Sequence, residues 1–195
     1  MNISIMIRIA LVGDIGSGKT FISKLFGFPV FNADLSVTKI YSKNKKVYFT
    51  LKKQLPNFFT SFPIKKKELI NAIIKNEKNI KKISAIVHPE VKKDLNKFIN
   101  KNSKSKAVVL DIPLYLENKL DKKKDIIIYI QSSTQEVQKR IKRRKNFNNL
   151  VLKKLKKLQL SLGIKKKRSH YVIKNNFRKN LARKNVEDII NKILT

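Results

Sequence analysis

Cysteine is absent from this chain of 195 residues, which excludes disulfide bonds and thiol catalysis. Only two histidines, His88 and His170, remain, and without cysteine they are too few for a structural zinc site. The chain also lacks an apolar run of membrane-spanning length, and its apolar start is broken at Arg8, as in a buried strand rather than a signal peptide. We therefore expect a protein of the reducing cytoplasm with no membrane partner.

Acidic residues are scarce, with 13 against 46 lysines and arginines, so the net charge is +33. Such a charge points toward nucleic acid, because clustered cations release counterions from a phosphate backbone. Here, however, the cations are spread along the chain, only seven are arginine, and no basic stretch carries interleaved aromatic residues for base stacking. A strong A+T codon bias explains the lysine excess better. We expect no specific nucleic-acid partner, although the charge helps to attract anionic substrates; the sequence specifies no oligomeric state.

Glycine is also rare, and three of the five glycines fall in the segment Gly13-Asp-Ile-Gly-Ser-Gly-Lys-Thr20. This segment follows an apolar run and precedes a helix-like pattern that ends at Gly27, which is the context of a phosphate-binding P-loop. Glycines let successive backbone N–H groups turn toward phosphates, and the helix N-terminus adds partial positive charge. We expect Lys19 to reach the terminal phosphates and the Thr20 hydroxyl to bind Mg²⁺. The sequence thus predicts a nucleoside triphosphate site.

The rest of the chain alternates short β-branched runs with helical patterns. Besides the first strand, we expect strands at 28–32, 106–110, 125–130 and 171–173. A long helical stretch at about 35–102 is interrupted near two prolines, and further helices are expected at 134–145, 147–162 and 186–194. This alternation predicts an α/β fold with a doubly wound parallel sheet of about five strands. The length suits one globular domain with a small inserted subdomain.

Four charged residues stand out against the lysine-rich background. Asp111 ends an apolar strand, where a carboxylate either holds Mg²⁺ or its water or is a strand-end turn residue. Asp34 also follows a strand, and it is either a general base or the N-cap of a helix, the reading that position alone favours. Arg140 and Arg144 share one helix face, and they either clamp phosphates as a lid or belong to a solvated cationic face.

Together these segments resemble the dephospho-coenzyme A kinase family. The family loop GGIGSGK(S/T) is present as GDIGSGKT, and a D-A-D after the second strand as Asn32-Ala33-Asp34. Further family patterns, I-x-HP-x-V, D-I-P-L-L-x-E, R-x-x-x-R, and a later Q, K and V-I-x-N, are met in chain order by Ile86–Val91, Asp111–Glu117, Arg140 with Arg144, Gln159, Lys165, and Val172–Asn175. The match runs from about Ile7 to Asn175.

The resemblance implies transfer of the ATP γ-phosphoryl group to the ribose 3′-hydroxyl of dephospho-coenzyme A with Mg²⁺, the last step of coenzyme A synthesis. It implies that Asp34 is the general base and that Lys19 and Arg140 are catalytic. The nucleotide site that it implies comprises Gly13, Ile15, Gly16, Ser17, Gly18, Lys19, Thr20, Phe21, Arg144 and Asn175. The acceptor site would comprise Asp34, His88, Asp111, Pro113, Leu114 and Glu117, with Thr20 and Asp111 on the metal.

By the same resemblance this is a P-loop NTPase with an inserted helical substrate subdomain and a helical lid. Its expected segments are a core (1–34, 104–134 and 170–195), an acceptor-binding subdomain at about 35–103, and a lid at about 135–169. From its residue types alone, His88-Pro89 is expected to start a helix, with proline at the first position.

Several residues depart from the family pattern, and two other functions stay open. Asp14 and Asn32 replace a glycine and an aspartate, Lys65-Lys66 replace an acidic-arginine pair, and Ser169-His170 replace an alanine-aspartate pair. Asp14 puts a carboxylate near the phosphates, which weakens ATP binding unless it points away. The alternatives are another small P-loop kinase for nucleosides or nucleotides, and a basic nucleotide-dependent protein that binds nucleic acid.

Overall fold

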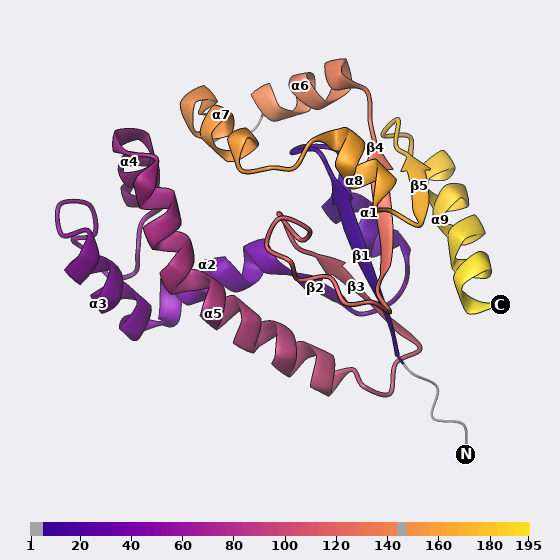
Figure 1. Cartoon of the computed structure of the whole chain (residues 1–195), viewed down its shortest axis with the longest axis horizontal. Coiled ribbons are helices and arrows are strands. Elements are labelled where there is room, and N and C mark those ends of the chain that lie inside the picture. The colour runs from indigo at the N-terminus through magenta and orange to yellow at the C-terminus, as the bar shows by residue number, and fades with distance from the viewer. Residues whose placement is uncertain (1–5, 144–147) are drawn as a thin grey trace. The chain divides into compact units, whose positions relative to one another are not determined.

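The computed structural model describes residues 6–143 and 148–195 of the chain. Its elements, coloured along the chain in Figure 1, are β1 (Ile7–Gly13), α1 (Lys19–Leu25), β2 (Val30–Asn32), α2 (Ala33–Lys43), α3 (Lys45–Gln54), α4 (Lys66–Lys75), α5 (Lys78–Lys101), β3 (Ala107–Asp111), β4 (Ile126–Gln131), α6 (Thr134–Lys142), α7 (Asn149–Lys157), α8 (Leu162–Lys167), β5 (Tyr171–Lys174) and α9 (Lys179–Leu194). They form two compact units, which we call the sheet unit (Met1–Asn32, Asn102–Phe147 and Leu158–Thr195) and the helical unit (Ala33–Lys101 and Asn148–Lys157).

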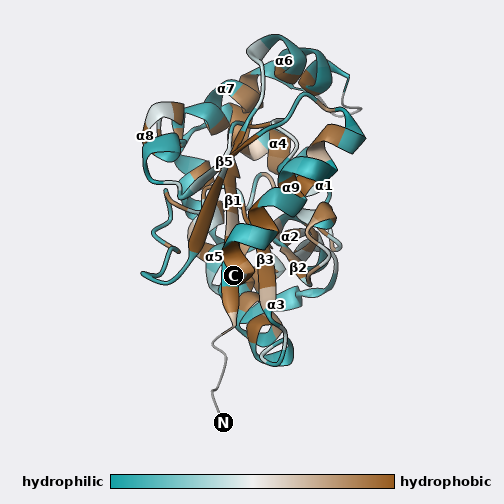
Figure 2. Cartoon of the chain, turned by 90° about the vertical axis from the view of Figure 1, so that its right-hand side faces the viewer, coloured by the Kyte–Doolittle hydropathy of each residue, from teal (hydrophilic) through white to brown (hydrophobic). Residues whose placement is uncertain are grey.

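The sheet unit contains five parallel strands in the order β2-β3-β1-β4-β5. Every residue of β3 is buried, as is most of β1 and β4, because β-branched side chains fill both faces of these strands. Helices α1 and α9 lie on one side of the strands and α8 on the other (Figure 2). The predicted α/β fold with a doubly wound parallel sheet is confirmed.

The strand order marks the carboxyl-terminal edge of this sheet as the expected place for a ligand. From the central strand β1 the chain adds β2 and β3 on one side and β4 and β5 on the other. Ligands of α/β proteins bind where the order reverses in this way, beyond the carboxyl ends of the strands. The loop after β1 and the last residue of β3, Asp111, both lie at that edge because Ala10 pairs with Leu110 in parallel register.

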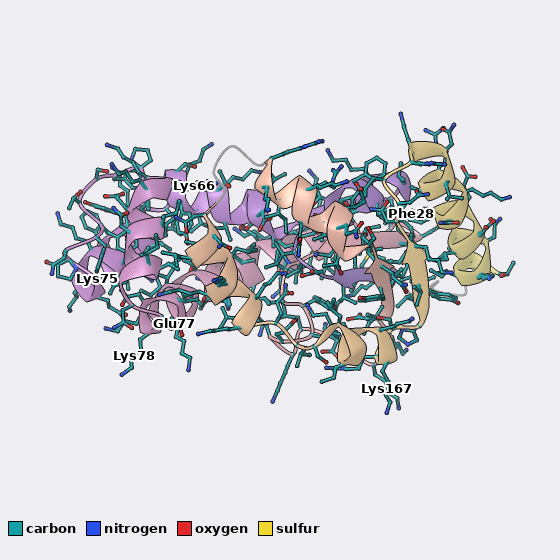
Figure 3. The ribbon with its side chains drawn as sticks, turned by 90° about the horizontal axis from the view of Figure 1, so that it is seen from above. Phe28, Lys66, Lys75, Glu77, Lys78 and Lys167 are labelled. Carbon is teal, nitrogen blue, oxygen red and sulfur yellow. The ribbon has the colours of Figure 1, made fainter. Side chains whose placement is uncertain are left out.

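The helical unit has a core of its own, formed by apolar side chains of α2, α3, α4 and α5 with the segment between α3 and α4. Helix α7 packs in this unit against α4, where the Lys154 ammonium donates to the carbonyls of Ile73 and Ile74 at 3.0 and 2.9 Å. These carbonyls end α4 and lack helical partners, so Lys154 caps that helix. Lys157 forms an exposed ion pair with Glu77 at 3.0 Å, in the turn after α4 that Figure 3 labels.

The helix prediction at His88-Pro89 is wrong, because Pro89 lies inside the long helix α5. Ile83 and Val87 of that helix are buried in the core of the helical unit, with Ile86 and Val91 packed against it. A proline inside a helix costs about 3 kcal/mol through a lost hydrogen bond and a steric clash. Burial of this apolar face offsets that cost, since helices in proteins are stabilised mostly by packing.

Two further helix boundaries differ from prediction. The stretch predicted as one helix at 147–162 holds α7 and then a break, and α8 begins only at its end, where the N-cap Ser161 accepts a hydrogen bond from the Ile164 N–H. The Ser161 side chain thus starts a second helix instead of continuing the first. Helix α9 begins at Lys179, earlier than predicted, because Ala182 is a buried contact that continues the spacing of Val186 and Ile189.

Within the described residues no helix is long and apolar enough to cross a membrane. The lysines are spread over the surface of both units, as the outward-pointing side chains in Figure 3 show, among them the labelled Lys66, Lys75, Lys78 and Lys167.

One buried polar network joins the starts of two sheet strands to the segment after β3. The Arg8 Nε lies 3.1 Å from Asp125 Oδ1, and the Arg8 guanidinium also donates to the Tyr115 hydroxyl at 2.9 Å. Tyr115 in turn donates to Asp125 Oδ2 at 2.5 Å. Burial, followed by the Asp125 carboxylate, raises the pKa of the Tyr115 phenol, so this group stays a neutral donor. The network anchors the segment that carries Pro113 and Leu114.

We predict that Asp125→Asn lowers the free energy of unfolding by about 3 kcal/mol, because it leaves the buried Arg8 charge without a counter-charge. Urea denaturation followed by circular dichroism measures this loss. Tyr115→Phe is the matched control, which removes two hydrogen bonds but no charge and costs about 1–2 kcal/mol. Equal losses in the two variants would contradict a role for the charge pair.

Candidate active site

The glycine loop after β1 has a backbone that only glycine accommodates. Gly16 and Gly18 have φ values of 85° and 91°, in the left-handed region that L-residues rarely adopt. A Cβ atom on Gly18 would lie 2.4 Å from Asn175 Nδ2, and one on Gly16 would lie 2.7 Å from Ile141 Cγ1. The loop is therefore closely packed from two sides, and Gly18 forms the N-cap of α1.

Lys19 and Asp14 both bond to the loop itself. The Lys19 ammonium donates to the Asp14 carbonyl at 2.8 Å and to the Gly13 carbonyl at 3.4 Å. The Asp14 carboxylate accepts the Ile15 N–H at 2.7 Å. In this geometry Asp14 occupies one backbone donor of the loop, and the Lys19 ammonium is held by two loop carbonyls.

Side chains from two other elements converge on one oxygen of Asp111 at the end of β3. The Thr20 hydroxyl, from the first turn of α1, donates to Asp111 Oδ2 at 2.6 Å. The Asn32 amide, at the end of β2, donates to the same oxygen at 2.7 Å. Asp111 is only 3% exposed, and no cation among residues 6–143 and 148–195 forms an ion pair with it. A buried carboxylate beside a hydroxyl is the oxygen donor set that suits Mg²⁺.

Asn32 explains why this carboxylate is tolerated in a buried place. Its side chain is a neutral donor aimed at Asp111, in register with it across the β2–β3 pair. A second carboxylate there would repel Asp111, whereas the amide stabilises it. The structure thus gives this departure from the family pattern a physical role.

A second lysine, Lys165 of α8, lies beneath the glycine loop. It is 2% exposed, its ammonium forms an ion pair with Glu117 at 2.8 Å, and it approaches the Gly13 carbonyl at 3.4 Å. Glu117 also accepts the Leu160 N–H at 3.0 Å. Pro113, Leu114 and Glu117 line one small pocket together with the two lysines. The sequence marked Lys165 only as a motif match; in a chain so rich in lysine, nothing in it signals this burial.

Arg140, in the last turn of α6, stacks on an aromatic ring that the sequence analysis missed. Its guanidinium carbon lies 4.2 Å from the centroid of the Phe177 ring. Phe177 follows Asn175, a residue only 2% exposed whose amide donates to the Ser17 carbonyl at 2.8 Å. The structure therefore brings Arg140 and Asn175 to the glycine loop. Arg144 lies outside the described residues.

Asp34 and His88 belong to the helical unit. Asp34 lies in the first turn of α2, which begins at Ala33, and its side chain is exposed. The same turn is held by the Ser36 hydroxyl, which donates to Asp94 of α5 at 2.6 Å. His88 lies on the exposed face of α5. Both residues are thus on rigid helices with access to solvent.

The family model described as dephospho-CoA kinase matches residues 7–191 of the chain. The chain belongs to the dephospho-CoA kinase family. A dephospho-CoA kinase of Fusobacterium nucleatum is 31% identical over 97% of this chain and 96% of its own length. One of Wolbachia pipientis is 30% identical over 95% of this chain and 97% of its own length.

Solved structures agree on the fold. A protein of Thermus thermophilus superposes with a TM-score of 0.80 at 23% identity, covering 97% of this chain and 98% of its own. The dephospho-CoA kinase from Campylobacter jejuni superposes with a TM-score of 0.62 at 22% identity, covering 95% and 96%. The sheet unit and the helices of this chain therefore have the architecture of P-loop kinases.

We predict that Gly18→Ala abolishes measurable ATP binding and destabilises the fold by roughly 2 kcal/mol, because the new methyl group meets the buried Asn175 amide as well as the left-handed backbone. Isothermal titration with ATP and urea denaturation measure the two effects. Gly27→Ala is the matched control, since Gly27 has a φ of 69° but open space around its Cβ position. It is expected to cost about 1 kcal/mol with ATP binding unchanged. Equal behaviour of both variants would contradict the packing argument.

Proposed function

We propose that this protein transfers the γ-phosphoryl group of ATP to the ribose 3′-hydroxyl of dephospho-coenzyme A, giving coenzyme A and ADP. The family is one of ATP-dependent kinases, and the chain matches it over nearly its whole length. The observation that carries the proposal is the convergence of Thr20 and Asn32 on Asp111 beside the glycine loop. The proposal adds the loop amides and Lys19 to this group, which together would meet the needs of phosphoryl transfer from ATP.

The proposed metal ligands are Thr20 and Asp111, whose oxygens suit a hard divalent cation. Thr20 and Asp111 would hold Mg²⁺ there, and the ion would supply positive charge against the negative charge that develops during transfer. Among the described residues no cluster of three or more acidic or histidine side chains could hold a metal by itself. Few protein ligands are typical of Mg²⁺ sites, where one or two carboxylates act together with waters and substrate phosphates.

On the nucleotide side, binding falls to the loop residues Gly13, Ile15, Gly16, Ser17 and Gly18, with Phe21 in the helix that follows. In the structure, Lys19 bonds to two loop carbonyls, which are weak acceptors beside a phosphate. We expect it to exchange them for phosphate oxygens, because charge-assisted hydrogen bonds are the stronger ones. Arg140, and Arg144 beyond the described residues, would add positive charge over the transferring group. Asn175 would support the nucleotide by holding Ser17.

On the acceptor side, Asp34 is the proposed general base. Its side chain is exposed in the first turn of α2, and a carboxylate within hydrogen-bond reach of the attacking hydroxyl takes the proton of that hydroxyl. The remaining acceptor contacts are assigned to His88, Pro113, Leu114 and Glu117. Ion pairing with Lys165 fixes Glu117, so its part in the acceptor site is to shape the pocket wall.

The proposed reaction is tested by ADP release from the purified protein with ATP and Mg²⁺, with and without dephospho-coenzyme A, and by the product mass. We expect ADP only with the acceptor, a product heavier by one phosphoryl group, and no turnover after EDTA treatment until Mg²⁺ is restored. Phosphorus and proton NMR then locate the new phosphate on the 3′-oxygen. ADP release that ignores this acceptor would overturn the proposal and favour another small P-loop kinase.

Asp34→Asn is predicted to slow acceptor phosphorylation by about 100- to 10,000-fold, the usual contribution of a general base, with the ATP dissociation constant unchanged. Single-turnover kinetics and ATP titration separate the two quantities. The control Asp188→Asn removes an exposed carboxylate from α9 and should leave both values as in the wild type. If Asp34→Asn kept most of the rate, Asp34 would serve only the start of α2.

A further inference from the structure

Phe177 has a backbone conformation that an aromatic residue rarely adopts. Its φ is 64°, in the left-handed region, where the side chain of an L-residue crowds the following carbonyl. Strain of this kind persists only where the surroundings hold it, and such residues cluster at functional sites. The Phe177 N–H donates to Asn175 Oδ1 at 3.0 Å, and the Asn175 amide donates to Ser17 of the glycine loop at 2.8 Å. Asn175 therefore fixes Phe177 against the P-loop.

The ring of Phe177 lies between the P-loop and Arg140. Its Cε1 atom lies 3.1 Å from the position that a Cβ atom on Gly18 would take, so the ring packs directly on Gly18, the N-cap residue of α1. The Arg140 guanidinium carbon lies 4.2 Å from the ring centroid, which is close for a cation–π contact. Among residues 6–143 and 148–195, no carboxylate forms an ion pair with Arg140.

The chemistry of the ring explains why it suits this place. A carboxylate would hold an arginine more strongly, but it would also cancel the positive charge that a triphosphate needs. The face of a phenyl ring attracts the guanidinium through its quadrupole and adds no net charge. Arg140 is thereby held near the α1 N-terminus with its charge still available to an anion. A lysine, with its compact and strongly hydrated ammonium, would stack less well.

We propose that Phe177 is a positioning residue that holds Arg140 over the P-loop for the nucleotide phosphates, and that its strained backbone is retained for this purpose. The proposal rests on the proposed function only in taking the phosphates of ATP as the ligand of Arg140. It assigns no contact between Phe177 and the phosphates, because the ring acts through the arginine.

The test is ATP binding, measured by titration calorimetry without acceptor, in Phe177→Gly and Phe177→Tyr. Glycine relieves the backbone and removes the ring, so we expect an ATP dissociation constant about two- to fivefold higher. Tyrosine keeps an aromatic face and should stay within about twofold of the wild type. An unchanged dissociation constant in Phe177→Gly would overturn the proposal.

A double-mutant cycle separates positioning from simple packing. In an Arg140→Met background, Phe177→Gly should change the ATP dissociation constant by less than about 1.5-fold, because the residue through which it acts is gone. A full additive effect in that background would overturn the proposal, since Phe177 would then act on the loop and not on Arg140.

Lys119→Gly is the matched control for backbone strain, because Lys119 has a φ of 51° and an exposed side chain. It should raise the melting temperature by about 2–4 °C and leave ATP binding unchanged. The melting temperature of Phe177→Gly should lie at most about 2 °C below that of the wild type, because relieved backbone strain offsets the lost ring contacts. A large loss of stability with normal ATP binding of the folded fraction would show that the ring is structural. Failure of the wild type to phosphorylate dephospho-coenzyme A would overturn the proposed function alone.

Discussion

The site is organised around a single oxygen, Asp111 Oδ2, which accepts one hydrogen bond from Thr20 and one from Asn32. These donors come from α1 and from the end of β2, so the bond pair ties together the loop after β1 and two neighbouring strand ends. A buried carboxylate without such donors would be costly, because desolvation disfavours its charge. Two neutral donors stabilise that charge while leaving Asp111 Oδ1 for a cation. The junction fixes the first turn of α1, which directly follows the glycine loop, and it contains both proposed metal ligands.

The role of each cation near the loop depends on the group that holds it, not on the total charge of the protein. Most of its lysines are solvated and raise the general attraction for anions. The few cations next to the loop are each held by a particular partner: Lys165 by Glu117, Lys19 by loop carbonyls, and Arg140 by the Phe177 ring. The partner decides the role, because a carboxylate cancels the charge that it holds whereas a carbonyl or a ring leaves it available. Lys165 therefore braces the loop, whereas the Phe177 ring leaves Arg140 the charge that its proposed role at the phosphates requires.

Much of the fold was predictable, and the errors concern the boundaries of helices. The central strands β1, β3 and β4 are short, largely apolar runs whose burial on both faces follows from composition, and the P-loop follows from its glycine spacing. Helix boundaries were less predictable, because Pro89 breaks a local rule that packing in the helical unit overrides, and Ser161 interrupts a pattern that continues in residue type. The roles of Asp34 and His88 are predictions from the family resemblance, and the kinetics of Asp34→Asn test the first of them.

The sequence by itself determined the phosphate loop, the parallel α/β architecture and the family, because glycine spacing, strand periodicity and ordered motifs are local properties of the chain. Only the tertiary structure decided what holds each functional side chain. Asn32 and Asp111 are 79 residues apart in the sequence, and Arg140 of α6 stacks on Phe177, which lies in the loop after β5. Local pattern cannot reveal such pairs, since one lysine or asparagine resembles another until the sheet brings distant strand ends together and excludes water from between them.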